Sequence, residues 1–369
     1  MSAIKYNYDL IAYHDSWISL DPIIGCRYNC TYCFLRVPGW TKKTPQRLFS
    51  PQYSVNKLLN HRYFVRDKTV ISLGNRTDLF LEDSINYTIK LLEELYKNNL
   101  RNTICISTKS YIPMKFINEL KAFKNLNLII FLSLSGLPRN IEPGINHNHI
   151  KENLINLSNE GINVIHYWRP LIPLNSSESQ LNDILDIVSK YSKCSVIVGL
   201  KYCPELRKLF EKEQGLHIPD DQIALYGEWL SPEIENKIET LRKAKYSDYP
   251  IFKHTSCAVS YTLNKPDYNA TIYMENICKV SNCPESQRKI CMSAASMPSH
   301  NNIQNLFKQY NLNASYRINK RKIIIDAEIS QEEYISLLHN INFPISANVK
   351  FTNILHGSIF KEVRLIHNQ

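Results

Sequence analysis

Short apolar runs alternate with helical patterns between about residues 18 and 212, and this alternation limits the chain to a few folds. The apolar runs lie at 22–25, 69–73, 103–107, 128–133, 164–168 and 196–199. Each is almost continuously apolar, which is typical of parallel strands buried on both faces. Between the runs, apolar residues recur three and four positions apart, as at 85–95, 150–157 and 181–188, and this spacing indicates amphipathic helices. Six strand–helix units predict a parallel α/β array, either barrel-like or doubly wound.

The rest of the chain follows other patterns. Residues 218–245 are polar and helical, 251–295 are rich in cysteine and proline, 300–305 form a predicted polar linker, and 322–352 show strand, helix and strand. We therefore expect three regions. They are the α/β array at 1–215, a helical and Cys-rich segment at 216–300, and a small α+β domain at 301–369.

Composition narrows the class of protein. The 369 residues contain no apolar run of about 18 residues, the length that a membrane-spanning helix needs. The first residues lack the apolar stretch of a secretory signal, so we expect a cytoplasmic protein. The chain has 10 cysteines, and several of them are clustered in the sequence. In a reducing compartment, such clusters indicate metal or redox chemistry rather than disulfides. The net charge of +10 is compatible with a nucleic acid, a phosphorylated substrate or solubility alone.

Three cysteines follow the first predicted strand with two short spacings, at Cys26, Cys30 and Cys33. Three thiolates on so short a loop can hold three irons of a [4Fe–4S] cube and leave the fourth iron open to a small chelating ligand. A structural zinc site needs four ligands, so a zinc loop or three unrelated buried thiols are the weaker alternatives. Active sites of βα arrays lie at the carboxyl ends of the strands. The loop therefore predicts a metal-based active site.

This loop, with Tyr32 and Phe34 beside its last cysteine, resembles that of the radical SAM enzymes. The likeness continues through 74–80, 107–110, 132–133, 142–144 and 170–173, and it is similar in order to the spore photoproduct lyase-like (DNA repair photolyase-related) branch. The resemblance covers about residues 18–205. It implies a partial (β/α)6 TIM-like barrel, a [4Fe–4S] cluster on the three cysteines, and S-adenosylmethionine (SAM) on the open iron. It also implies reductive cleavage of SAM to a 5′-deoxyadenosyl radical, which abstracts hydrogen from a substrate, and an electron donor such as flavodoxin or ferredoxin.

The resemblance also implies residues that bind SAM. Lys109 and Ser133 would contact its amino-acid end, and the turn at 74–78 would line its amino or ribose side. Arg169 would reach the carboxylate or a substrate phosphate. Ordinary solvation of strand ends or helix capping is the alternative role for several of them. The implied SAM-binding residues are Gly74, Asn75, Thr77, Asp78, Lys109, Ser133 and Arg169.

One departure from this branch concerns the end of the second predicted strand, where the lyase itself is expected to carry a hydrogen-donating cysteine. The turn at 75–76 holds Asn and Arg instead, so photoproduct reversal is not expected unless another cysteine substitutes. Cys105 and Cys194 fall in or beside predicted strands, where apolar packing accounts for them. Cys203, next to Tyr202, is the remaining candidate for a radical relay.

A second group of cysteines, Cys257, Cys278, Cys283 and Cys291, falls within one segment rich in turn-forming residues. Four thiols with this loop-like spacing could fully ligate a second, auxiliary [4Fe–4S] cluster. They would also suit a tetrahedral zinc site. The third alternative is a set of partly buried free thiols.

The leading hypothesis is a radical SAM enzyme whose substrate is a nucleic acid or a nucleotide-like molecule, on branch resemblance and positive charge. A peptide or a small metabolite is the alternative substrate. A protein of a different class, a non-catalytic Fe–S or zinc nucleic-acid-binding protein, would have no use for the SAM-binding residues. Their presence favours the enzyme.

Overall fold

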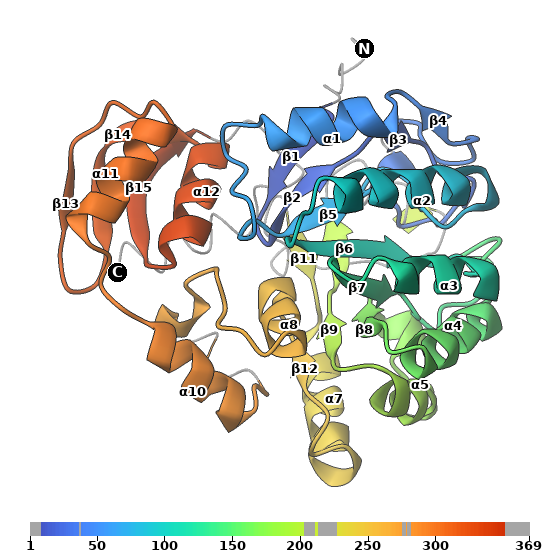
Figure 1. The fold of residues 1–369 in the computed structure, drawn as a ribbon. Coiled ribbons are helices and arrows are strands. Elements are labelled where there is room, and N and C mark those ends of the chain that lie inside the picture. Colours follow the sequence, from blue (N-terminus) through green and yellow to red (C-terminus); the bar gives the residue numbers. More distant parts are fainter. Residues whose placement is uncertain are drawn as a thin grey trace.

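The alternating strands and helices build an open, mainly parallel sheet (Figure 1). The computed structural model describes residues 9–36, 38–202, 211–212, 227–274, 278 and 282–350. The strand order in the sheet is β1-β2-β5-β6-β7-β8-β9-β12. Their bounds are β1 (Ile11–His14), β2 (Trp17–Leu20), β5 (Ile71–Leu73), β6 (Thr103–Thr108), β7 (Asn127–Leu132), β8 (Asn163–Trp168), β9 (Ser195–Ile197) and β12 (Ile251–Phe252).

All neighbouring pairs from β2 to β12 are parallel, and β1 runs antiparallel to β2. Because β1 and β12 stand at opposite ends of this order and do not pair, the described strands form a partial barrel, as predicted. The strands are buried on both faces, which explains their continuous apolar runs.

Helices follow the strands and cover one face of the sheet (Figure 1). They are α1 (Pro51–Leu59), α2 (Glu82–Lys97), α3 (Met114–Ala122), α4 (His147–Asn159), α5 (Glu178–Tyr191) and α7 (Pro232–Lys245). The start of α5 shows why these segments fold as they do. The Ser177 side chain accepts a hydrogen bond from the Gln180 backbone, and the Gln180 side chain accepts one from the Ser177 backbone. This capping box satisfies two of the free donors at the helix start.

The first predicted strand, at 22–25, is not part of the main sheet. The sheet strand is Trp17–Leu20, and the chain leaves the sheet at Asp21 and Pro22, where proline has no N–H to donate to a ladder. The next residues form β3 (Ile23–Ile24), which pairs with β4 (Gln46–Arg47) in a separate two-stranded sheet. At its other edge the main sheet extends past residue 215, because β12 pairs with β9.

The predicted C-terminal strand–helix–strand is confirmed. It consists of β14 (Ile323–Ser330), α12 (Gln331–Ile341) and β15 (Ile345–Lys350), with β13 (Tyr316–Ile318) as a third strand. The predicted polar linker at 300–305 is wrong, since these residues begin α11 (His300–Gln309). Ile303 and Phe307, four positions apart, bury one face of that helix against the core.

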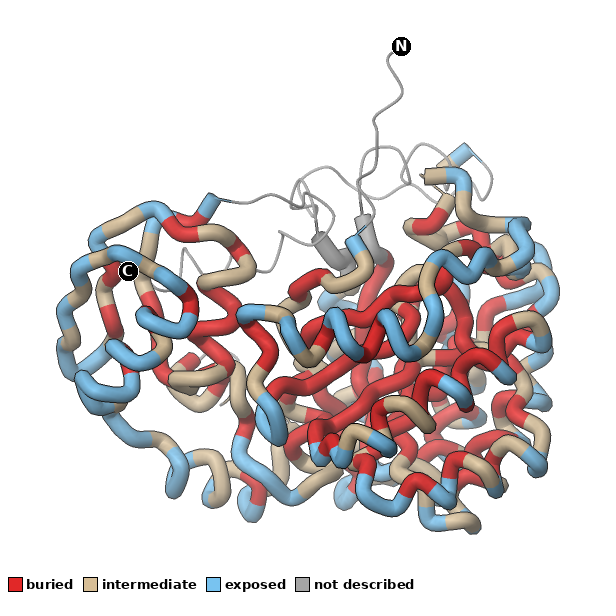
Figure 2. Tube along the Cα trace, turned by 45° about the horizontal axis from the view of Figure 1, so that its top comes forward, coloured by how far each residue is buried: buried red, intermediate tan, exposed pale blue. Residues whose placement is uncertain are grey.

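Shorter elements connect these parts. They are β10 (Leu200–Tyr202) paired with β11 (Gly227–Trp229), α8 (Thr255–Thr262), α10 (Glu285–Ala294), and the 3-10 turns η1 (Phe34–Arg36), η2 (Pro173–Asn175) and η4 (Thr271–Tyr273). Figure 2 shows the buried residues gathered along the sheet and the inner sides of its helices. In the described part of the chain, no helix combines the length and the apolar character needed to cross a membrane.

Candidate active site

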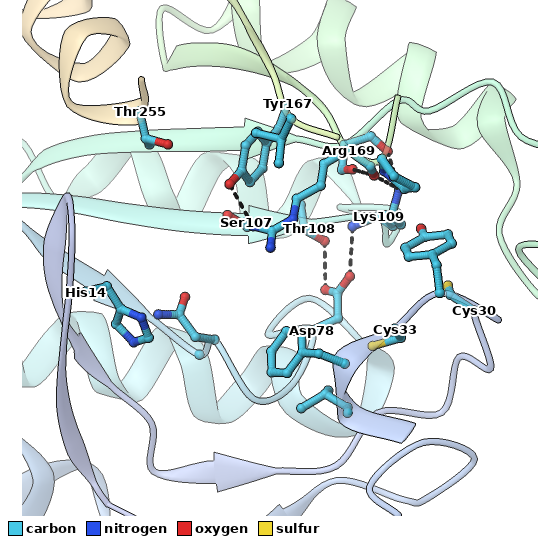
Figure 3. Close-up of a pocket in the computed structure, with 18 of the residues that line it drawn as sticks. His14, Cys30, Cys33, Asp78, Ser107, Thr108, Lys109, Tyr167, Arg169 and Thr255 are labelled. Carbon is cyan, nitrogen blue, oxygen red and sulfur yellow. Dashed lines mark hydrogen bonds between the residues drawn. The ribbon is translucent and has the colours of Figure 1, made fainter. Parts of the chain in front are cut away.

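A cleft of about 310 Å³ opens at the carboxyl ends of the strands (Figure 3). Its lining comes from the cysteine loop, from the segments after β5, β6, β7 and β8, and from three further segments described below. All ten residues predicted for the first cluster and for SAM line this one cleft. They are Cys26, Cys30, Cys33, Gly74, Asn75, Thr77, Asp78, Lys109, Ser133 and Arg169.

The cysteine loop places three thiols at one end of the cleft. The backbone of Cys26 is held by a hydrogen bond from its N–H to the Trp40 carbonyl (2.9 Å). Burial raises the pKa of the Cys30 thiol to about 12, and the Glu142 charge adds to this rise. Burial also raises the pKa of Cys33, although the charges of Arg169 and other nearby cations oppose it. Thiols with raised pKa values stay protonated until a metal displaces their protons.

Tyrosine hydroxyls dock this loop on the strand ends. Tyr28 Oη lies 3.1 Å from Ser110 Oγ, and Tyr32 Oη donates to Glu142 Oε1. Gly144 lets the loop approach closely, because its φ is +87° and an added Cβ would lie 3.3 Å from the Tyr28 ring. These contacts fix the positions from which the cysteines face the cleft.

Glu142 lies behind the loop and is only 1% exposed. Its Oε1 lies 2.9 Å from Lys109 Nζ, and its Oε2 lies 2.5 Å from Ser135 Oγ and 3.0 Å from His147 Nε2. Burial alone would raise its pKa, but the Lys109 charge and the bonds from His147, Ser135 and Tyr32 lower it to about 2. Glu142 is therefore an ionised acceptor at neutral pH.

Lys109 connects the ends of three strands. Besides Glu142, its Nζ lies 3.2 Å from the Ser133 carbonyl and 3.3 Å from the Arg169 carbonyl. An ammonium group has three N–H donors, so these three acceptors engage it fully. A direct contact from Lys109 to SAM would require one of these bonds to be exchanged. Ser133 Oγ also donates to the Arg169 carbonyl (3.2 Å).

Asp78 lies between the ends of β5 and β6. It accepts hydrogen bonds from Thr108 Oγ1 (2.7 Å), the Lys109 backbone N–H (2.8 Å) and the Phe80 backbone N–H (3.1 Å). Burial raises its pKa, and these bonds oppose that rise. Asp78 fixes the geometry of two strand ends where they meet the cleft (Figure 3).

The turn at 74–78 lies against the cysteine loop. Gly74 has a φ of +71°, and an added Cβ would lie 2.3 Å from Leu79 Cγ, so no other residue fits without strain. The Asn75 N–H donates to Asp21 Oδ1 (2.6 Å), and Thr77 Oγ1 donates to the Gly25 carbonyl (2.6 Å). The turn and the start of the loop therefore form one hydrogen-bonded unit.

The far wall of the cleft consists of residues that no motif in the sequence predicts. They are His14, Asp15, Ser16 and Trp17 from the turn between β1 and β2, Tyr167, Val198 and Gly199, and Lys253, His254 and Thr255 after β12. In Figure 3, His14 and Thr255 lie on the opposite side of the view from Cys30 and Cys33. One signal was available: polar residues follow the apolar pair of β12 as they follow the other strands.

The remaining cysteine predictions have separate outcomes. Cys105 and Cys194 are fully buried in one apolar cluster, which confirms that they serve packing. Cys203 lies outside the described residues, as does the side chain of Tyr202. Among the residues that the structure describes, the cleft holds no cysteine beyond the three of the loop.

Comparison with known proteins identifies one domain of the chain. The model of the radical SAM superfamily matches residues 20–188. Residues 20–188 are a radical SAM domain. This domain belongs to a superfamily of enzymes that use a [4Fe–4S] cluster and SAM. A search of curated proteins gives no match.

Solved structures agree in fold. Spore photoproduct lyase complexed with dinucleoside spore photoproduct is similar over 67% of this chain and 79% of its own, with a TM-score of 0.51 and 11% identity. A variant of that lyase with bound AdoMet and dinucleoside spore photoproduct is similar over 65% and 78%, with a TM-score of 0.50 and 12% identity. At these identities the likeness shows a shared fold.

Proposed function

We propose that Cys26, Cys30 and Cys33 hold a [4Fe–4S] cluster, that the adjacent strand ends bind SAM, and that the enzyme abstracts hydrogen from a nucleotide-like substrate. When bound, the cluster and SAM supply the electron and the 5′-deoxyadenosyl radical. The observation that carries the proposal is the convergence of ten residues from separate segments on one cleft.

The residues of the cleft suit these groups. Arg169 and Lys109 are cations beside the thiols, and their charges lower the pKa of Cys33 against the effect of burial. The same cations favour an anionic cluster and the carboxylate of SAM. The turn at Gly74 lines the cleft, and Leu79 packs against the side of Gly74 where a side chain would otherwise stand. The protein's part is to orient the cofactor against the substrate and to exclude water.

Three observations support a nucleotide-like substrate. The chain carries a net charge of +10, which favours phosphate groups. Arg169 lies at the cleft, with its Nη1 2.8 Å from the Tyr167 hydroxyl, so its guanidinium is held in one orientation. The similar lyase structure contains a dinucleoside photoproduct. Reversal of such a photoproduct by a thiol of the cleft is not proposed, because no fourth cysteine lines the described cleft.

The test is the rate of 5′-deoxyadenosine formation by the anaerobic, reconstituted enzyme with SAM and reduced flavodoxin or ferredoxin. We expect a short single-stranded oligodeoxynucleotide to raise this rate about tenfold, and a peptide of similar length to leave it unchanged. Arg169→Met should raise the oligonucleotide concentration needed for half-maximal stimulation. Arg66→Met is the matched control, because Arg66 bonds to the Asn98 carbonyl on the surface, outside the cleft. Stimulation by the peptide and not by the oligonucleotide would overturn the substrate class.

A further inference from the structure

A second group of thiols meets in a pocket separate from the cleft. Its lining includes Cys257 of α8, Cys283 and Cys291 at α10, and Cys278 from the segment before it. No residue lines both this pocket and the cleft. The sequence placed these cysteines up to 34 positions apart, and the fold brings them to one place. The four cysteines line this one pocket, and none of them forms a disulfide.

The groups around the thiols are those that stabilise metal-bound sulfur. The Asp267 backbone N–H points at Cys291 Sγ (3.3 Å), and Gln287 Nε2 lies 3.5 Å from the same sulfur. Gln287 is 3% exposed, so its amide is a buried donor aimed at the pocket. Arg288 brings a cation to the lining of the pocket. N–H donors to the sulfurs are one means by which proteins adjust an iron–sulfur cluster.

Asp267 supplies a second observation. Its carboxylate lines the pocket and is 5% exposed. Its Oδ2 accepts hydrogen bonds from the backbone of Asn269 and Thr271, but its Oδ1 is buried without a hydrogen-bond partner among the described residues. Burying a carboxylate oxygen beside four thiols without compensation is costly. An unmatched buried oxygen at the lining of this pocket points to a bound group that the described residues do not supply.

We propose that Cys257, Cys278, Cys283 and Cys291 ligate a second [4Fe–4S] cluster, with all four irons bound to protein. A single zinc ion is less compatible, because Zn–S bonds of 2.3 Å in a tetrahedron place the sulfurs about 3.8 Å apart. Within the described part of the chain, no three Cys, His, Asp or Glu side chains are grouped to hold one metal ion. The three thiols of the Cys26, Cys30 and Cys33 loop are likewise not grouped around a single ion. A [4Fe–4S] cluster is larger than one ion, so its ligands stand farther apart. The second site is independent of the proposed reaction.

The test counts metals in the full-length protein. After anaerobic reconstitution with iron and sulfide, we expect about eight irons per chain in the wild type, and about four in both Cys26→Ser/Cys30→Ser/Cys33→Ser and Cys283→Ser/Cys291→Ser. The decisive sample is the triple variant, whose remaining irons should show the Mössbauer spectrum of a [4Fe–4S] cluster. Cys105→Ala is the matched control, because Cys105 is buried outside both pockets, and it should keep about eight.

Two outcomes would overturn the proposal. One is about four irons in the wild type and none in the triple variant, which would leave the proposed function intact. The other is one zinc per chain that disappears in Cys283→Ser/Cys291→Ser. Iron that persists in the triple variant and disappears in Cys283→Ser/Cys291→Ser would instead support the second site and contradict the first. Mössbauer counting on the wild type needs no variant to fold, and circular dichroism checks the fold of each one.

Discussion

Glu142 accepts hydrogen bonds from Tyr32, Ser135 and His147 and pairs with Lys109 where almost no water reaches. A buried carboxylate in such a position is costly to leave unmatched. Glu142 joins the cysteine loop to Lys109, whose ammonium group bonds to residues at the ends of neighbouring strands. Its physical role is therefore to position both the loop and Lys109.

We predict that Glu142→Gln lowers the free energy of unfolding by about 3 kcal/mol at pH 7, because Lys109 is left uncompensated. The pKa of Glu142 is about 2, below its ordinary 4.5, so the folded state binds fewer protons between these values. The stabilisation is therefore present above pH 4.5 and lost as the pH falls toward 2. Urea unfolding at pH 7 and pH 3 should show the difference from the wild type shrinking at low pH.

The matched control for this variant is Glu160→Gln. Glu160 forms an exposed pair with Lys121 at 2.7 Å, and its loss should cost less than about 1 kcal/mol. Equal effects of the two substitutions would contradict the role assigned to Glu142.

Gly74 gives a second test at this scale. Gly74→Ala should lower the free energy of unfolding by a few kcal/mol and weaken SAM binding, because its Cβ would meet the Leu79 side chain at 2.3 Å. Gly161→Ala is the control: its φ of +75° is similar, but nothing lies within 4 Å of an added Cβ. It should cost about 1 kcal/mol, from the backbone conformation alone. Urea unfolding and calorimetric titration with SAM measure both effects, and equal losses would show that the close approach is unimportant.

At the scale of elements, the sequence predicts those helices that have a helical apolar period and those strands that have a continuous apolar run. Strands β5 to β9 and helices α2, α4 and α5 lie where the patterns indicate. Strand β12 is missed, since Ile251 and Phe252 alone show no period. The segment 300–305, predicted as a linker, contains one apolar residue, Ile303, and the Leu306 and Phe307 that pack beside it on α11 lie beyond that segment.

The same limit applies to the cleft. Its cysteine end was predictable because its residues stand in short motifs at the ends of recognisable strands. Its far wall joins the turn at His14 to the segment at Lys253, about 240 positions away in the sequence. Only the three-dimensional closing of the sheet brings these segments together, and no local pattern encodes it.

The hydrogen bond that holds the cysteine loop to Glu142 gives a further prediction. Tyr32→Phe removes the hydrogen bond to Glu142 and should cost about 1–2 kcal/mol of stability. Because the loop is then held less firmly, bound iron should be lost faster to a chelator, as followed by visible absorbance. Tyr111→Phe removes a similar bond to Glu152 at an exposed position and is the control. If both variants lose iron at the wild-type rate, the hydroxyl does not hold the loop.

At the scale of the whole molecule, C-terminal residues support the wall of the cleft. His339 Nε2 lies 2.8 Å from the Asp15 carbonyl, and Tyr268 Oη donates to the Ser16 carbonyl (2.6 Å). Asp15 and Ser16 line the cleft. Through His339 of α12, the C-terminal strand–helix–strand segment therefore holds the β1–β2 turn in place.

This contact predicts a pH dependence. Burial lowers the pKa of His339 to about 4, from 6.5. The folded state binds fewer protons than the unfolded chain between these values, so stability rises with pH across this window. Acidification from pH 7 to 5 should remove about 2 kcal/mol through His339, and His339→Gln should lack this part of the loss. Burial also lowers the pKa of His166 to about 4 and raises the pKa of Asp21 to about 6. Both groups titrate equally in variant and wild type, so their contributions cancel in the comparison. Urea unfolding of variant and wild type at pH 7, 6 and 5 measures this loss. If the free energy of unfolding changes equally with pH in the two proteins, the prediction is contradicted.

The most direct test of the account is whether the cleft cleaves SAM. The reconstituted wild type, given SAM and dithionite without oxygen, should form 5′-deoxyadenosine, and so should Cys105→Ala, whose thiol lies in the apolar core. Cys33→Ala should form none, because one of the three thiols at the cleft is lost. Product from Cys33→Ala at the wild-type rate, or none from a wild type that holds its iron, would contradict the assignment of this cleft as the active site.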